Sequence, residues 1–459
     1  MTAIDQYLTA HRDRFVDELC EYLRFPSVSA QPEHAGDLRA CADWIAGHCR
    51  GIGLEAEVHP TGGSPIVLAR TPRRAGARKP HFLVYGHYDV QPPDPLDLWK
   101  SPPFEPRISG DSLFARGASD NKGQHFAHLK AVEAYLRTGT ELPCDLTFLI
   151  EGEEEVGCTH LGPFLRARQK DLRCEAIVIS DTGMPSPKHP ALTYALRGIV
   201  ALEVTVRGPD RDLHSGIFGG SVDNPAMVLC EMLAKLRNAK GRILVPGFYD
   251  DVRKLNAFER RQVARLPYDE KAERRFLGVP ALRGESGFTC LEQRSARPTC
   301  EINGLTSGYQ GEGSKTIIPS WARAKLTFRL VADQDPVRVL RQVKAWLKEV
   351  CPPTVRMEIS DGHGGAPYQI EPTGALAQAA LRALKKAFGR EPVLLREGGS
   401  IPIVNDFRRL LGVDSILLGL ALPNANAHSP NEQFSLTIFE KGMAMSARLW
   451  PELSSAVEG

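Results

Sequence analysis

The stretch Leu146-Thr-Phe-Leu-Ile150, followed at once by Glu151-Gly-Glu-Glu-Glu155-Val-Gly157, decides how the rest of the chain is interpreted. Its short apolar run is typical of a buried strand. The four carboxylates in residues 151–155 repel one another, and each favours protonation beside the others. A divalent cation removes that conflict, because it is the largest local charge. A solvated acidic turn is the alternative, and this run alone does not decide between the two.

Two further apolar segments predict buried strands that end in polar side chains. Residues 81–86 precede His87 and Asp89, and residues 176–180 precede Asp181. With the helical segments between them, they predict an α/β domain built on a mostly parallel sheet that is covered on both faces. Because ligands in such sheets bind beyond the carboxyl ends of the strands, we expect these side chains to meet in one crevice.

The pattern changes after residue 197. Segments 198–207 and 323–330 alternate apolar and polar residues, which is typical of strands with one wet face. The elements from 198 to 361 follow the β-α-β-β-α-β order of a ferredoxin-like α+β domain. We therefore predict an α/β domain in two parts, residues 1–197 and 362–459, with this second domain inserted between them. Within the insertion, residues 250–295 are predicted to be irregular.

Composition excludes several classes of protein. The 459 residues include 57 basic and 55 acidic ones, a net charge of +2, which gives no sign of a nucleic-acid partner. No apolar stretch approaches the roughly 18 residues of a membrane helix, and no signal peptide is visible. The ten cysteines are scattered without a Cys-x-x-Cys pair. They favour buried thiols in a reduced cytoplasmic protein over a disulfide framework.

Metal-type side chains recur beyond the predicted strands or in tight turns. They are His87, Asp89, Asp120, the acidic run 151–155, Asp181 and His428. Singly, each has a simpler interpretation, such as a strand-end histidine or a capping aspartate. Their joint placement at one sheet edge favours a shared metal site, and mixed imidazole and carboxylate ligands suit zinc, manganese or cobalt.

Six motifs, in this order along nearly the whole chain, resemble the aminoacylase/carnosinase-type di-metal peptidase family. They are Gly86-His-Tyr-Asp-Val90, Arg116-Gly-Ala-Ser-Asp-Asn-Lys-Gly123, Glu154-Glu-Val-Gly157, Asp181, Asp212-Leu-His-Ser-Gly216 and His428-Ser-Pro-Asn-Glu432. The resemblance is closest to the branch of the cytosolic non-specific dipeptidases and carnosinases, because Lys315-Thr-Ile-Ile-Pro319 and Glu397-Gly-Gly-Ser-Ile-Pro402 are present too.

The resemblance implies a catalytic domain that holds two divalent ions, with zinc as the first choice and manganese or cobalt as alternatives. Asp120 would bridge the ions. The remaining ligands would be His87 and Asp181 for one ion, and Glu155 and His428 for the other. Asp89 would support His87, since a carboxylate on a ligating imidazole fixes its tautomer.

Glu154 would be the general base, because Val-Gly follows the pair Glu154-Glu155 as the family pattern requires. Other distributions of base and ligand among Glu153, Glu154 and Glu155 stay open. The implied reaction is metal-dependent hydrolysis of the amide bond of dipeptides or other small peptides. Glu154 would take a proton from the attacking water and pass it to the leaving amine.

On the inserted domain, the resemblance implies a dimerisation and lid function. His214 would stabilise the oxyanion in the partner's site of a homodimer with shared active sites. Arg329 would clamp the substrate carboxylate, with Thr316 and Ser400 as polar contacts. A glycine-rich hinge is predicted at 362–365, where the chain returns to the first domain.

Two alternatives accompany this prediction. The same metal centre would also serve an N-acyl or N-carbamoyl amino acid amidohydrolase. A non-catalytic binding protein on the same fold is the alternative of another class. That alternative predicts lost ligands, whereas every expected ligand type is present.

Overall fold

The structure, a computed structural model, describes residues 2–72, 79–399 and 401–458. The chain divides into two compact units. The first comprises residues 1–194, 370–395 and 403–459, and the second comprises residues 195–369 and 396–402. The second unit is thus largely an insertion in the first.

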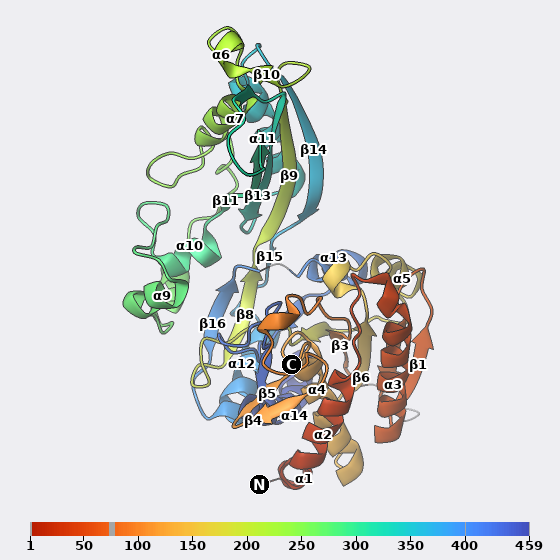
Figure 1. Cartoon of the computed structure of the whole chain (residues 1–459). Coiled ribbons are helices and arrows are strands. Elements are labelled where there is room, and N and C mark those ends of the chain that lie inside the picture. The colour runs from red at the N-terminus through yellow and green to blue at the C-terminus, as the bar shows by residue number, and fades with distance from the viewer. Residues whose placement is uncertain (1, 73–78, 400, 459) are drawn as a thin grey trace. The chain divides into compact units, whose positions relative to one another are not determined.

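A mixed sheet forms the framework of the first unit (Figure 1). Its central strands β6, β3, β7 and β17 run parallel, whereas the pairs β1–β2, β2–β6 and β17–β8 are antiparallel. In spatial order the strands are β1 (Glu55–His59), β2 (Ile66–Arg70), β6 (Asp145–Glu151), β3 (His81–His87), β7 (Ala176–Ile179), β17 (Ser415–Leu417) and β8 (Ala191–Leu196). Strands β15 (Tyr368–Gln369) and β16 (Val393–Glu397) also pair with β8. The α/β class is confirmed, with the parallel strands at the centre of the sheet.

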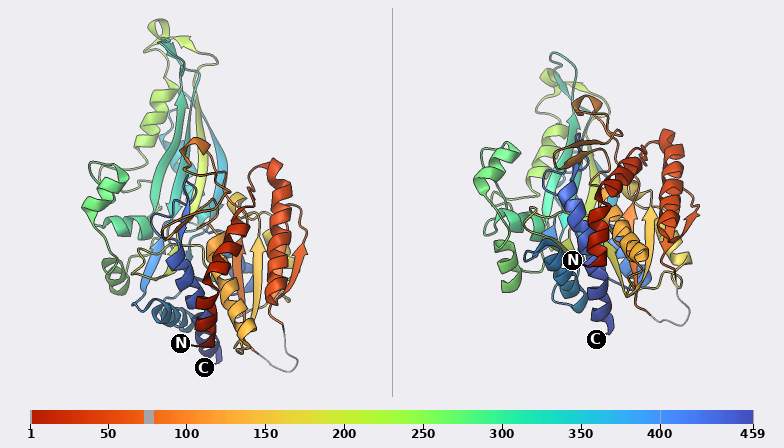
Figure 2. Two further views of the ribbon diagram at one scale, coloured as in Figure 1. Left: turned by 60° about the horizontal axis from the view of Figure 1, so that its bottom comes forward. Right: turned by 90° about the horizontal axis from the view of Figure 1, so that it is seen from below.

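Helices pack on this sheet, and α4 is the most buried of them. All its residues from Lys122 to Tyr135 are buried, and it contacts β3 as well as α1, α2, α3 and α14. Figure 2 shows α14 (blue) running beside the N-terminal helices (red). The helices are α1 (Ala3–Ala10), α2 (Arg12–Leu23), α3 (Ala35–Ile52), α4 (Lys122–Thr138), α5 (Leu161–Ala167), α12 (Ala375–Phe388), α13 (Ile403–Leu411) and α14 (Leu436–Glu458), with short 3₁₀ turns η1 (Pro32–His34), η2 (Leu96–Leu98) and η3 (Glu154–Val156).

A small sheet brings two distant loops of the first unit together. Strand β5 (Ser112–Phe114) pairs with β4 (Arg107–Ser109) on one side and with β18 (Gln433–Ser435) on the other. The loop that carries Asp120 follows β5, and the loop that carries His428 precedes β18. Among the helices of the described ranges, none has the length and apolar character needed to cross a membrane.

The second unit contains a four-stranded antiparallel sheet in the order β11-β13-β9-β14 (Figure 1). With its helices it follows the ferredoxin-like pattern: β9 (Gly198–Arg207), α7 (Pro225–Ala234), β11 (Thr299–Ser307), β13 (Trp321–Leu330), α11 (Pro336–Val350) and β14 (Arg356–Gly365). Alternate apolar residues of β9 and β13 form its core with α7 and α11. A two-stranded sheet of β10 (Leu213–His214) and β12 (Ile317–Ile318) leads into α6 (Ser215–Phe218).

Two details of the second unit differ from the sequence prediction. Residues 250–295 are not irregular throughout, since they form α8 (Ala257–Ala264), α9 (Glu270–Leu277) and α10 (Cys290–Ala296). Capping boxes at Asn256 and Thr289 start α8 and α10, which explains how such short, charged helices form. The glycines at 362–365 belong to β14, where Gly364 and Gly365 pair with β9, so this segment continues the sheet.

Candidate metal centre

His87, Asp120 and Asp181 form one group of ligand-type side chains. His87 ends β3, and Asp181 follows β7, the adjacent parallel strand. The Nε2 atom of His87 lies 3.3 Å from Oδ1 of Asp120 and 3.7 Å from Oδ2 of Asp181. Each residue offers one ligand atom, and these atoms lie within 4.8 Å of one another.

Asp120, Glu155 and His428 form a second group that satisfies the same criterion. The Nε2 atom of His428 lies 2.8 Å from Oδ2 of Asp120 and 3.4 Å from Oε2 of Glu155. Asp120 therefore presents Oδ1 to the first group and Oδ2 to the second. This arrangement is the one that a carboxylate bridging two cations needs.

The carboxylates in both groups change the pKa values of the histidines beside them, and burial changes the pKa values of the carboxylates. Burial raises the pKa of Asp181 to about 6. Burial would also raise the pKa of Asp120, but the neighbouring imidazoles of His428 and His87 outweigh it and lower that pKa. Hydrogen bonds to Asp120 and Glu155 raise the pKa of His428 to about 10. Protons on the imidazoles thus balance the carboxylates, and binding a divalent cation would release them.

The donor atoms fit two divalent cations. Among the residues that the structure describes, Nε2 of His87 and Oε1 of Glu155 are buried and have no hydrogen-bond partner. Burying a polar atom without a hydrogen bond destabilises the folded protein, and coordination of a cation would replace the missing hydrogen bond. Imidazole nitrogens with carboxylate oxygens suit zinc, manganese or cobalt.

The three glutamates of the acidic run have different surroundings. Glu153 accepts hydrogen bonds from the backbone N–H of Ser64 (2.9 Å) and of His160 (3.1 Å), so it is bound to neighbouring loops. Glu155 belongs to the second group. Within the described ranges Glu154 belongs to neither group. Burial raises the pKa of Glu154 well above its usual range. The charge of His87 lowers this pKa, and the negative charges of Asp181, Glu155 and Asp120 raise it.

Asp89 supports both His87 and the acidic run. Nδ1 of His87 lies 3.0 Å from the backbone carbonyl oxygen of Asp89 and 3.4 Å from its Oδ1. The Asp89 carboxylate accepts hydrogen bonds from the backbone N–H groups of Glu154 (3.2 Å) and Glu155 (3.1 Å). The histidine is thus held mainly by the backbone carbonyl, while the carboxylate fixes the turn that carries the two glutamates.

Glu432 was not predicted as a site residue, although it ends the motif that begins with His428. It is fully buried, and its carboxylate accepts hydrogen bonds from the backbone N–H groups of Gly117 (2.9 Å), Ser119 (2.8 Å) and Asp120 (3.0 Å). Arg116 Nη1 donates a fourth, at 2.8 Å. One carboxylate therefore fixes the loop of the bridging candidate to the loop of the second histidine.

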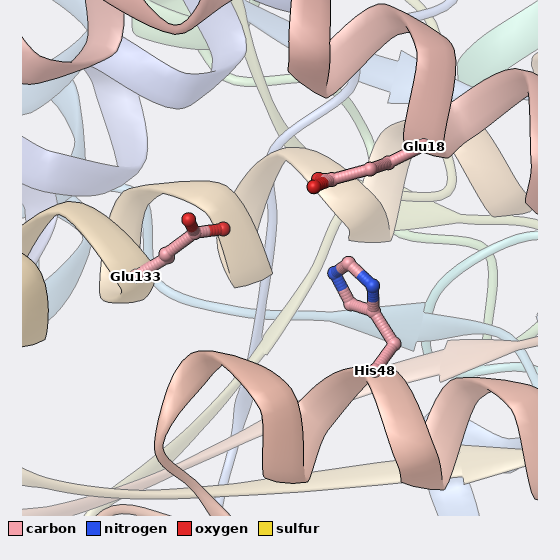
Figure 3. Close-up of side chains that lie close together, drawn as sticks. All are labelled: Glu18, His48 and Glu133. Atoms are coloured by element: carbon pink, nitrogen blue, oxygen red, sulfur yellow. The ribbon is translucent and has the colours of Figure 1, made fainter.

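A third group of metal-type side chains contains Glu18 of α2, His48 of α3 and Glu133 of α4, which point toward one another (Figure 3). The buried Lys130 occupies this group. Its Nζ contacts Nε2 of His48 (2.7 Å), Oε2 of Glu133 (2.9 Å) and Oε2 of Glu18. Burial, and then the charge of Lys130, lowers the pKa of His48 to about 3, so the imidazole is a neutral acceptor. An internal ammonium thus takes the place of a metal ion here.

In the second unit, the predicted substrate contacts lie at two ends of the sheet. His214 is exposed, pairs with Ile317, and accepts a hydrogen bond from Gly216 N–H at Nδ1 (3.0 Å). The carbonyl oxygen of Thr316 accepts from Ser215 N–H at 3.1 Å, so Thr316 lies beside His214. Figure 1 shows β10 and α6 at one end of this unit.

Arg329 lies near the other end of β13, opposite Ile199 of β9. It is eight residues beyond Trp321, which at strand geometry places it roughly 26 Å along the strand. Arg197 is two residues before Ile199 in the chain, and burial and then the charge of Arg329 lower the Arg197 pKa to about 10. Two guanidinium groups therefore lie at this end of the sheet, and one of them, that of Arg197, donates from Nε to the carbonyl oxygen of Gly398 at 3.1 Å. Ser400, the remaining predicted contact, lies outside the described residues.

Comparison with known proteins covers nearly the whole chain. The family model described as Peptidase family M20/M25/M40 matches residues 83–452. The chain is 30% identical to the Cys-Gly metallodipeptidase dug1 of Schizosaccharomyces pombe, over 97% of this chain and 96% of that protein. It is 31% identical to the Beta-Ala-His dipeptidase of Rattus norvegicus, over 99% and 96%. The crystal structure of the M20 family metallo-carboxypeptidase Sso-CP2 from Sulfolobus solfataricus matches with a TM-score of 0.85 and 32% identity, covering 96% of this chain and 99% of that one.

Proposed function

Because this chain belongs to Peptidase family M20/M25/M40, we propose that it is a metal-dependent hydrolase that cleaves the amide bond of dipeptides. The observation that carries the proposal is the position of Asp120, whose two carboxylate oxygens face two separate groups of ligand-type side chains. We propose His87 and Asp181 as the other ligands of one ion, and Glu155 and His428 as those of the second. Zinc is the first choice of metal for this donor set.

Two cations bound there would polarise the scissile carbonyl and lower the pKa of the attacking water. In the proposed mechanism Glu154 accepts the proton of that water and delivers it to the leaving amine. Burial raises the pKa of Glu154, so its ionised carboxylate is a stronger proton acceptor than one exposed to solvent. Asp89 holds the backbone of Glu154 through a hydrogen bond from its N–H at 3.2 Å. Arg329 supplies a fork of donors for the substrate carboxylate.

The test is hydrolysis by chelator-stripped protein, before and after addition of zinc or manganese. We expect less than about 1% of the activity without metal, because loss of several kcal/mol of transition-state stabilisation slows the reaction at least a hundredfold. Activity should return when two equivalents of metal are added. The rate of amine release from dipeptides measures this directly.

The substrate panel separates the alternatives. It contains free dipeptides, their C-terminal amides, longer peptides, and N-acyl and N-carbamoyl amino acids. We expect free dipeptides to be cleaved fastest, and the amides poorly, because they lack the charge for the Arg329 clamp. Faster cleavage of the acylated or carbamoylated compounds by metal-loaded protein would contradict the dipeptidase proposal.

We further propose a homodimer in which His214 completes the partner's site. Support comes from the second unit itself, where His214 and Arg329 lie near opposite ends of the sheet and are not placed to contact one small substrate together. Mixing Glu154→Gln subunits with His214→Ala subunits should restore activity, because half of the sites in a mixed dimer combine both intact residues. Random assortment predicts ~25% of wild-type activity. No recovery in proven mixed dimers, or a fully active monomer, would refute the shared site.

A cytoplasmic location is proposed from the cysteines. All ten are free thiols in the structure, and several are buried, as expected in a reducing compartment. Cell fractionation tests this, and recovery of the native protein outside the cytoplasm would contradict it.

A further inference from the structure

We propose that Tyr22, His125 and Asn121 form a directed hydrogen-bond relay that orients the Asp181 carboxylate toward the metal centre. None of the three is a metal ligand in the proposed function, on which this inference rests, and they act as positioning residues. Two elements of the first unit supply them, since Tyr22 lies on α2, whereas His125 lies on α4 and Asn121 is the N-cap of α4.

Asn121 makes the contact with the ligand. Its Nδ2 donates to Oδ1 of Asp181 at 2.9 Å and also to the carbonyl oxygen of Ser180. The other carboxylate oxygen of Asp181, Oδ2, faces His87 Nε2 in the first group of ligands. Asn121 therefore fixes one oxygen of Asp181 and leaves the second directed at the metal position.

The direction of the relay follows from which atoms can donate. Oδ1 of Asn121 lies 3.3 Å from the backbone N–H of His87, which can only donate, so this side of the amide must be the oxygen. His125 Nδ1 lies 3.0 Å from the same oxygen and must therefore carry a proton. The amide is thus held between two donors, with its NH₂ group turned to Asp181.

His125 has a single proton to give. Burial, and then the neighbouring His87 and His128, lowers the pKa of His125 well below its usual range, so the ring is neutral. With Nδ1 protonated, Nε2 is an acceptor, and the Tyr22 hydroxyl 3.3 Å away must donate to it. With this assignment, each donor along the line from Tyr22 to Asp181 faces an acceptor.

The surroundings hold the relay in place. A Cβ atom added at Gly86 would lie 2.7 Å from the Cβ of His125, so the absence of a side chain there gives the imidazole its space under β3. The Tyr22 ring stacks on Trp44 at 5.1 Å between ring centroids, and the Lys122 ammonium lies 5.0 Å from the Tyr22 ring centroid. Tyr22, His125 and Asn121 are each fully or almost fully buried.

The first measurement is the tautomer of His125 in wild-type protein, from the ¹⁵N shifts of its imidazole with and without zinc. We expect Nδ1 to be protonated and Nε2 to be unprotonated in both forms. This result does not depend on turnover, so it separates the relay from the proposed function. Protonation at Nε2, or a charged ring at neutral pH, would overturn the relay.

The second measurement is the dissociation constant for zinc, by competition with a chelator, in a set of variants. Tyr22→Phe should weaken zinc binding about threefold to tenfold, and His125→Leu about tenfold to a hundredfold, the range for residues that orient metal ligands. His125→Asn should recover most of the loss, because its amide can donate from a place near that of Nδ1.

Tyr135→Phe is the matched control. Tyr135 is a buried residue of α4 whose hydroxyl donates to the Ala447 carbonyl oxygen at 2.7 Å, outside the relay. It should leave zinc affinity unchanged, with a loss of thermal stability similar to that of Tyr22→Phe. Equal weakening of zinc binding in both phenylalanine variants, or wild-type affinity in both Tyr22→Phe and His125→Leu, would overturn the proposal.

Discussion

Glu154→Gln is expected to lower kcat for dipeptide hydrolysis about a thousandfold while leaving the bound metal in place. Glutamine keeps the shape of glutamate but cannot accept a proton, and general base catalysis contributes about 10² to 10⁴ in rate. Metal should be retained, because Glu154 lies outside both ligand groups among the described residues. Initial rates of amine release and the metal content of the same sample measure the two effects together.

Glu153→Gln is the control for this prediction. The Glu153 carboxylate is bound to the N–H groups of Ser64 and His160, so its change should alter kcat about tenfold at most. Near-normal turnover of metal-loaded Glu154→Gln would refute the base assignment. A collapse of kcat in the Glu153 variant instead would move the base to that residue.

Asp120→Asn is expected to remove activity by a factor of about a thousand through loss of metal. Asparagine offers one carbonyl oxygen and no charge, so it cannot serve both groups at once. The bound metal should fall from two ions per chain to one or none, and loss of several kcal/mol of charge stabilisation corresponds to this factor in rate. Elemental analysis after dialysis, combined with kcat, measures the effect.

Asp111→Asn provides the comparison for Asp120→Asn. Asp111 accepts hydrogen bonds from Ser435 and from the backbone N–H and hydroxyl of Thr437, away from the ligand groups. Its variant should keep two ions and a normal rate, with some loss of stability. Two retained ions and wild-type turnover in Asp120→Asn would show that Asp120 does not bridge the metals.

The sequence predicted those features that depend on short-range patterns. Strand periodicity located β3, β6 and β7, and parallel strands bring their carboxyl ends to one edge. His87 and Asp181 meet for that reason. Asp120 and His428 lie in loops that periodicity does not describe, and the family motifs assigned them their positions in the ligand set.

Features that depend on contacts between distant segments were not predictable in the same way. Glu432 accepts hydrogen bonds from the N–H groups of Gly117, Ser119 and Asp120, more than 300 positions earlier. Asn121 likewise reaches Asp181 from a different element. Residues 362–365 suggested a hinge because glycine is flexible, yet pairing with β9 places them in a strand. The position of Thr316 beside His214 depends in the same way on the pairing of β10 with β12.

The Lys130 ammonium among Glu18, His48 and Glu133 has a consequence for how the enzyme is assembled in the cell. The Lys130 ammonium is the counter-ion of these carboxylates, and because it belongs to the polypeptide it is present as soon as the chain is synthesised. Helices α2, α3 and α4 can therefore pack together before any metal has been delivered. Charge balance among these three helices therefore does not depend on metal supply, whereas charge balance in the proposed di-metal centre does.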